Sequence, residues 1–249
     1  PAVLCLLLAS SASAGQLGRF AEALEKSAAA AEAAPPKKSA SGKTLDFGSG
    51  GLGGSDCEPL LLCAFLQVAA ATLDPTFAYA QARPAHMPIL PLFRLDGAYQ
   101  LIPKDVDAIS GRVELGRGPF AAAYERILFR EKEPRDRMWG WRGEALWRMA
   151  VGEGARLDAA VGYMGYQREG SHNGPSTGFS LGWYTSRSVG YEADVRWGSI
   201  GDGTSTDMRG RLFLGPKSWK GFALRPGYRG IRTGDATLHG PELTVSYTW

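Results

Sequence analysis

Between Ile89 and Trp249 the sequence contains ten short stretches in which apolar and polar residues alternate. The last stretch shows the pattern most simply, since Leu243, Val245, Tyr247 and Trp249 alternate with Glu242, Thr244, Ser246 and Thr248. Side chains of a β-strand point alternately to opposite faces, so a period of two predicts strands with one apolar face and one polar face. We therefore expect this region to be all-β.

Turn signals place the expected strands near 90–102, 108–117, 119–131, 138–150, 155–168, 176–187, 189–200, 206–215, 220–232 and 240–249. Short turns, such as 116–119, alternate with longer polar connections, such as 168–175. This arrangement predicts a closed antiparallel barrel that crosses a membrane with ten strands, or with eight if two segments merge. The short turns would then lie on the same side of the membrane as the first and last residues of the barrel.

The polar faces carry many charged residues. In the fourth stretch, Arg142, Glu144 and Arg148 lie opposite a face of tryptophans, whereas a soluble sandwich would carry Lys, Ser and Thr more often. Unpaired charges in a confined interior cost several kcal/mol each, so we expect a network of ion pairs in the lumen. Its predicted members are Arg94, Asp96, Arg112, Glu114, Arg142, Glu144, Arg148, Asp158, Glu192, Asp194, Arg196, Arg209, Arg211 and Arg225.

Aromatic residues fall near the strand ends, where an interfacial girdle is expected. The predicted girdle comprises Trp139, Trp141, Trp147, Trp183, Trp197 and Trp249. The third stretch departs from the pattern, because Phe120 and Tyr124 are out of phase with Ile127 and Phe129. We interpret this break as a bulge near Glu125 or an extension above the membrane.

The N-terminus has an apolar run from Val3 to Leu8, followed by Ala12-Ser13-Ala14 before Gly15. An apolar core that ends in a small-residue A-x-A pattern predicts a secretory signal peptide over 1–14. Because the chain begins at Pro1, we expect the start of this peptide to lie upstream. The run is too short to span a bilayer as a helix.

Residues 15–56 are expected to form an Ala-rich helix and a flexible linker. Residues 16–34 are good helix formers, but only Phe20 and Leu24 are large side chains spaced to meet. We therefore expect a marginal or disordered helix in the periplasm, followed by a Gly- and Ser-rich linker.

Residues 57–88 are expected to hold a short apolar helix near 60–73 and a Pro-rich segment that leads into the barrel of residues 89–249. The helix could cap the periplasmic mouth, lie on the inner leaflet or bind a partner. In an exported protein, Cys57 and Cys63 are candidates for a disulfide. The alternative is that Cys63 is simply a small apolar residue of the helix. Two thiols without a nearby histidine do not make a metal site, so neither a metal nor a cofactor is predicted.

The stretch 89–249 resembles the small outer-membrane β-barrel superfamily of Gram-negative bacteria. The resemblance rests on the alternating strands and the terminal aromatic strand, without a motif of one specific family. It implies an outer-membrane location with both chain ends in the periplasm. The implied partners are outer-membrane lipid, the barrel-assembly machinery through the C-terminal strand, and a periplasmic protein for the N-terminal segment. Nucleic acid is not expected, since the net charge of +3 is spread along the chain.

Three functions fit this interpretation. The favoured one is a non-enzymatic anchor or surface-interaction protein with a charge-filled lumen. A rim hydrolase is the second, since a ten-stranded barrel resembles the omptin proteases in strand count and Ser171-His172 resembles the pair of barrel lipid A deacylases. Its catalytic candidates are His172, His239, Asp202 and Asp235. Ser171 and His172 are adjacent, and adjacent residues in a strand point in opposite directions, so His172 could not readily activate Ser171. A narrow pore past Arg142, Arg196 and Arg209 is the third.

Overall fold

The computed structural model describes residues 15–33, 71, 73, 75–78, 80–81, 88–133, 135–151, 154–168, 170–200 and 203–249. The strands are β1 (Phe93–Ile102), β2 (Val106–Arg117), β3 (Phe120–Glu131), β4 (Asp136–Val151), β5 (Ala155–Gln167), β6 (Ser171–Tyr184), β7 (Val189–Ile200), β8 (Gly203–Leu214), β9 (Phe222–Thr233) and β10 (Ala236–Thr248). Helix α2 covers Gln16–Ala33, and the 3-10 turn η1 covers Lys217–Trp219.

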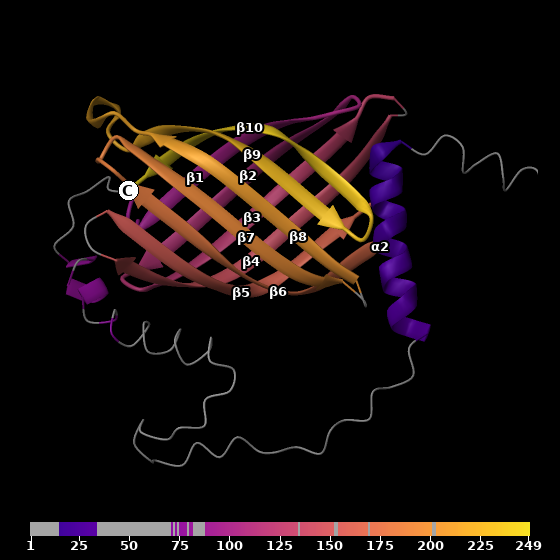
Figure 1. The fold of residues 1–249 in the computed structure, drawn as a ribbon, viewed down its shortest axis with the longest axis horizontal. Coiled ribbons are helices and arrows are strands. Elements are labelled where there is room, and N and C mark those ends of the chain that lie inside the picture. The colour runs from indigo at the N-terminus through magenta and orange to yellow at the C-terminus, as the bar shows by residue number, and fades with distance from the viewer. Residues whose placement is uncertain are drawn as a thin grey trace, which may run out of the picture.

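The ten strands form one closed barrel, in which each strand pairs antiparallel with its neighbours in sequence (Figure 1). The first and last strands close the sheet, with Arg94 opposite Thr248 and Gln100 opposite Glu242. This closure confirms the predicted ten-stranded antiparallel barrel and excludes the alternative of eight strands. Closure removes the exposed edges that an open sheet would present.

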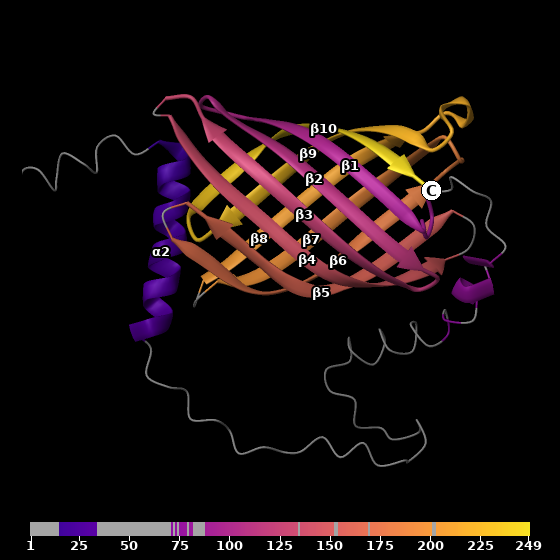
Figure 2. The same cartoon turned by 180° about the vertical axis from the view of Figure 1, so that it is seen from behind.

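The barrel has two ends, named here by what lies at each. The C-terminal end holds the start of β1 and the end of β10, where the Trp249 carbonyl accepts a hydrogen bond of 2.9 Å from the Leu92 N–H. The helix-side end holds the ends of β1, β3, β5, β7 and β9 and the starts of β2, β4, β6, β8 and β10. Helix α2 lies across the helix-side end, opposite the C-terminus, in both side views (Figures 1 and 2).

The connections at the helix-side end are not longer than those at the C-terminal end, so the predicted alternation of loop lengths is wrong. The clearest difference is β6, which begins at Ser171 and pairs with β5 through Pro175, opposite Tyr163. Gly174 lets β6 approach β7 here, because an added Cβ would collide with the carbonyl oxygen of Ser199. The predicted loop 168–175 is therefore mostly strand.

The third strand is regular, so the predicted bulge near Glu125 is wrong. The β2–β3 register runs without interruption from Val106 opposite Glu131 to Arg117 opposite Phe120. Glu125, Ile127 and Phe129 all lie on the buried inner face, whereas Phe120 and Tyr124 are exposed on the outside. The inner face thus changes from charged to apolar toward the helix-side end, without a change of phase.

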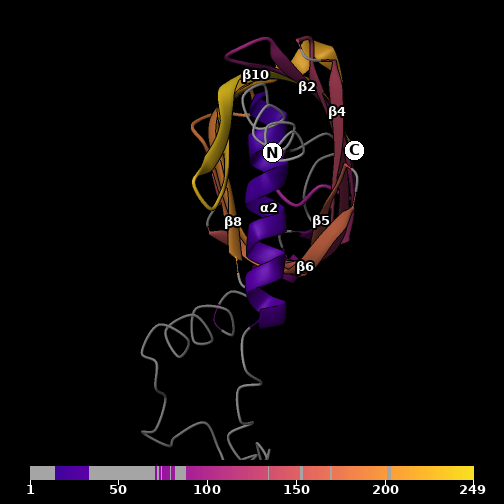
Figure 3. The same ribbon diagram turned by 90° about the vertical axis from the view of Figure 1, so that its right-hand side faces the viewer.

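That apolar end of the lumen binds α2. Leu17, Phe20 and Leu24 are buried at spacings of three and four residues, which puts them on one face of the helix. They pack with inward-facing strand residues in the helix-side cluster, whose strand members are Ile102, Val106, Ala108, Ile127, Phe129, Met138, Met164, Tyr166, Ile200, Ile231 and Leu238. Viewed from this end, the helix crosses the mouth of the barrel (Figure 3). The expectation of a marginal or disordered helix is corrected, because a narrow apolar stripe suffices when the barrel supplies its partners.

A second apolar cluster closes the C-terminal end. Ile89 and Leu90 are buried there against Ala150, Tyr184, Phe213 and Ala223 in the C-terminal cluster. The Thr76 hydroxyl accepts a hydrogen bond of 3.1 Å from the Ala150 N–H. Residues that precede β1 in the sequence therefore pack into this end of the barrel.

No helix among the described residues has the length and hydropathy needed to cross a bilayer. Several predictions concern residues outside the described ranges: the signal peptide of 1–14, the linker that follows α2, the pair Cys57 and Cys63, and most of the apolar helix near 60–73.

Candidate functional site

The lumen between the two apolar clusters is filled by paired charges. Arginines and carboxylates occur there in nearly equal number, and serine, threonine and glutamine side chains occupy other inward positions. The arginines are Arg94, Arg112, Arg142, Arg148, Arg156, Arg196, Arg209, Arg211, Arg225 and Arg229, and the carboxylates are Asp96, Glu114, Glu125, Glu144, Asp158, Glu192, Asp194, Asp207 and Glu242. This near balance lets a confined interior hold many ions without a large net charge.

Glu125 is the central acceptor of the network. Its two carboxylate oxygens lie 2.5 Å from Arg142 Nη2, 2.6 Å from Arg209 Nη2 and 3.0 Å from Arg229 Nη1. These arginines come from β4, β8 and β9, so one carboxylate on β3 joins opposite walls of the barrel. Asp207 supports the arrangement by accepting hydrogen bonds from Arg142 and Arg229 at 2.9 and 2.7 Å.

Glu192 is a second acceptor, nearer the C-terminal end. It accepts a 2.8 Å hydrogen bond from the Tyr184 hydroxyl and lies 3.2 Å from both Arg211 Nη2 and Arg225 Nε. Arg225 also donates to Asp96 at 2.9 Å. We call Glu125 and Glu192 the two carboxylate hubs. Charge-assisted hydrogen bonds of this kind are short and directional, so each hub fixes the arginine side chains of several strands.

Little open space is left between these side chains. The cavity in the charged layer has a volume of about 10 Å³, and its lining includes Arg94, Arg142, Asp194 and Arg209. One water molecule needs about that volume. Among the described side chains, the cavity at this level holds no more than about one water, which argues against the pore hypothesis.

At the helix-side end, α2 is held by polar contacts as well as by its apolar stripe. The carboxylate of Glu131, at the end of β3, accepts hydrogen bonds from the backbone N–H groups of Gln16 and Leu17 at 2.5 and 3.1 Å. The Gln16 side chain donates to the Thr237 carbonyl at 3.1 Å. The first turn of α2 is thus attached to β3 and β10, on two parts of the rim.

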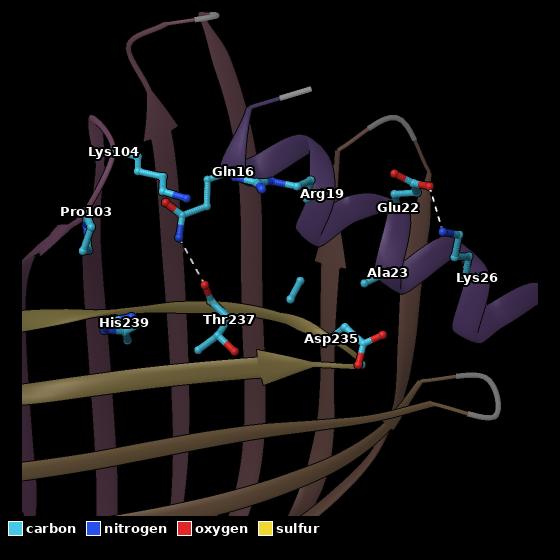
Figure 4. A pocket seen from close by; sticks show the side chains of 12 residues that line it. Gln16, Arg19, Glu22, Ala23, Lys26, Pro103, Lys104, Asp235, Thr237 and His239 are labelled. Atoms are coloured by element: carbon cyan, nitrogen blue, oxygen red, sulfur yellow. Dashed lines mark hydrogen bonds and ion pairs between the residues drawn. The ribbon is translucent and has the colours of Figure 1, made fainter. Parts of the chain in front are cut away.

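An open pocket of about 600 Å³ lies between α2 and the rim (Figure 4). Its lining residues are Gln16, Arg19, Glu22, Ala23, Lys26, Pro103, Lys104, Gly234, Asp235, Ala236, Thr237 and His239. The Lys26 ammonium lies 2.9 Å from Glu22, and this hydrogen bond raises the pKa of Lys26. Both side chains are exposed, so the pair adds little to the docking of α2.

All fourteen predicted members of the lumen network lie inside the barrel, and each has an ion-pair partner. Sequence reasoning missed Glu125, because the third strand was assigned a bulge at that position. It also missed Glu131. The signal was the spacing of Glu125, Ile127, Phe129 and Glu131, which a strict period of two places on one face.

The predicted catalytic residues do not form an acid-base set. His239 and Asp235 line the same pocket, but the Nδ1 atom of His239 lies 2.5 Å from the Tyr228 hydroxyl. His172 lies in β6 opposite Tyr166, and Asp202 falls outside the described residues. Within the described ranges, neither histidine hydrogen-bonds to a carboxylate or serine, and no group of three or more His, Cys, Asp or Glu is placed to hold a metal ion.

The predicted girdle residues Trp139, Trp183, Trp197 and Trp249 are exposed on the outer surface. The Arg126 guanidinium lies 4.3 Å from the ring centroid of Trp139, and Trp141 stacks with Tyr163 at 6.3 Å. At the C-terminal end, Phe222 and Tyr247 have ring centroids 4.9 Å apart. Aromatic residues therefore occur on the outer face near both ends.

No protein-family model matches the chain, and no curated protein matches it in sequence. Among solved structures, one match is the translocator domain of autotransporter NalP from Neisseria meningitidis. The two are 11% identical over 76% of this chain and 98% of the other, with a TM-score of 0.30. The architecture of the present chain rests on its own strand pairing.

Proposed function

We propose that this protein is a sealed outer-membrane barrel that anchors its attached segments and loops in the envelope without catalysing a reaction. The observation that carries the proposal is the inverted distribution of polarity. Charged side chains fill the inside, whereas large apolar side chains cover the outside of all ten strands. A water-soluble protein buries the second set and exposes the first.

Individual exposures show how complete the inversion is. Val161 is 60% exposed and Leu115 is 57% exposed, whereas Arg148 and Arg225 are 0% exposed. Soluble monomers rarely expose apolar patches larger than a few hundred Å². The apolar surface here continues around a closed sheet, and lipid is the solvent that such a belt fits.

The closed lumen supports an anchor rather than a channel. The charged layer lies between two apolar clusters, and the cavity among its described side chains, about 10 Å³, is too small for a hydrated ion. The absence of a linked nucleophile and base among the described residues removes the observation that a rim hydrolase needs. Anchoring and surface interaction need only a closed barrel, and Glu125 and Glu192 join arginines of different strands across its interior.

We place the barrel in the outer membrane of a Gram-negative bacterium, because closed barrels of this size with apolar outer faces are typical of that membrane. Lipid is its proposed main partner, and the exposed aromatic end of β10 is the proposed contact for the barrel-assembly machinery. Both chain ends of the barrel are proposed to face the periplasm. A periplasmic protein is a further proposed partner of the part of the N-terminal segment that packs at the C-terminal end.

Two measurements test this proposal. The purified chain in detergent should migrate faster on a denaturing gel when it is not boiled, since a closed barrel resists the detergent. In planar bilayers it should give no steady conductance. Equal migration of boiled and unboiled samples, with solubility in plain buffer, would overturn the membrane assignment. Stable conductance steps would overturn the sealed lumen and restore the pore.

A further inference from the structure

Glu131 is unusual among the inward-facing carboxylates. It is 5% exposed, yet no lysine or arginine side chain in the described part of the chain forms an ion pair with it. The other carboxylates buried in the barrel each have an arginine at ion-pair distance: Asp96, Asp107, Glu114, Glu125, Glu144, Asp158, Glu192, Asp194, Asp207 and Glu242. A buried carboxylate without a cation is costly, so this position calls for a positive charge.

The group that lies against Glu131 is the start of α2. Gln16 and Leu17 donate their backbone N–H groups to the two carboxylate oxygens. Gly15 is in direct contact as well, since a Cβ added to it would overlap the carboxylate. The carboxylate therefore lies beside the backbone of Gly15, and a side chain at this position would have to displace it.

Gly15 is also the residue that follows the Ala12-Ser13-Ala14 pattern. Hydrolysis of the bond between Ala14 and Gly15 by a signal peptidase adds one water molecule. The Ala14 carbonyl carbon takes the oxygen and leaves as a carboxylate, and the Gly15 nitrogen becomes an α-ammonium. Removal of a signal peptide at an A-x-A pattern thus creates a cation on the residue that directly precedes the two N–H groups bound by Glu131.

We propose that Glu131 is the receptor for the new N-terminus of the processed chain, and that α2 closes the barrel firmly only after cleavage at Gly15. Before cleavage, the Gly15 nitrogen is a neutral amide that carries residues 1–14, and the buried carboxylate has no cation. After cleavage, the ammonium and the N–H groups of Gln16 and Leu17 all serve one carboxylate. Hydrogen bonds between two ions are stronger than those to a neutral amide.

The test uses the full chain, exported by a Gram-negative host and purified in detergent. Mass spectrometry of the released N-terminal peptide should give a chain that starts at Gly15. Two rates then report the docking: acetylation of the α-amine by acetic anhydride, and tryptic cleavage after Arg19 and Lys26 in α2. In the wild-type protein both should be slow.

Two variants remove the ion pair in different ways. Glu131→Gln keeps the shape of the side chain but removes its charge, and insertion of one alanine between Ala14 and Gly15 keeps the amine but moves it by one residue. Each should raise both rates about tenfold or more, while the heat-shift of the barrel on a gel stays unchanged. Glu25→Gln, on an exposed position of α2, serves as the matched control.

A start at another residue would overturn the proposal, as would wild-type rates in both variants. If Glu131→Gln fails to form a barrel, the insertion variant decides alone, because it leaves the barrel sequence intact. The result is independent of the proposed anchor function. A conducting or enzymatic barrel would show the same two rates, and failure of the amine contact would leave the heat-shift and conductance results as they are.

Discussion

The ring of Phe20 on α2 meets the ring of Tyr166 on β5 edge to face, with ring centroids 5.5 Å apart and planes inclined by 75°. Both side chains are buried, and both belong to the helix-side cluster. Residues separated by most of the sequence thus share one core. The helix is therefore part of the folded barrel, and its docking can be measured separately from strand pairing.

Phe20→Ala should loosen α2 without opening the barrel. Loss of a buried phenylalanine typically costs about 3–5 kcal/mol, and here that loss falls on the contact between helix and mouth. Tryptic cleavage after Arg19 and Lys26 should accelerate strongly, while the gel heat-shift should be nearly unchanged. Glu22→Ala, on the exposed side of the helix, should behave like wild type. Equal protection of Phe20→Ala and wild type would show that the apolar stripe does not hold α2.

Glu125→Ala should lower the thermal stability of the barrel. Removing this carboxylate leaves Arg142, Arg209 and Arg229 without their shared acceptor. Breaking a buried ion pair by deleting one partner costs about 3–5 kcal/mol. The temperature at which the unboiled band converts to the boiled position should fall clearly below that of Glu133→Ala, an exposed control between β3 and β4. An unchanged conversion temperature would mean that the hub is dispensable.

Val161→Arg should impair insertion into lipid. Val161 lies in the middle of β5 on the exposed outer face, where an arginine costs about 2–4 kcal/mol at the bilayer midplane. The folded fraction in lipid vesicles, read from the gel heat-shift, should drop relative to wild type. Thr185→Arg, in the connection between β6 and β7, should fold as well as wild type. Equal folding of both variants would contradict the position of the lipid belt.

Deletion of residues 15–33 should not turn the barrel into a pore. The charged layer and the C-terminal cluster remain in place when α2 is absent, so the narrowest part of the lumen is unchanged. Planar-bilayer recordings should show the deletion variant as silent as wild type. Conductance in the deletion variant alone would instead make α2 the main seal.

The strands could be predicted from the sequence because each carries its own information. An alternation such as Leu243, Val245 and Tyr247 against Glu242, Thr244 and Ser246 is a local property, and it fixes which face meets which solvent. The positions of Arg142 and Glu144 in the lumen follow from the same local property, since neighbouring strands must share an inner face.

What could not be predicted depends on closure of the barrel. Glu125 meets Arg209 and Arg229 across the lumen, and no sequence spacing relates β3 to β8 and β9. The apolar inner residues near the helix-side end were interpreted as a break in phase, because their partner, α2, lies far away in the sequence. Phe129 therefore resembled a residue on the wrong face of the strand, although it is buried in the same apolar cluster as Leu17, Phe20 and Leu24 of the helix.

Ala33 ends the helix that covers one mouth, whereas Ile89 and Leu90 pack into the other. The two mouths of one barrel are therefore closed by different stretches of the same chain, one on each side of any bilayer that holds the strands. A protease added to one side of a sealed vesicle should reach α2 or the residues that precede β1, but not both.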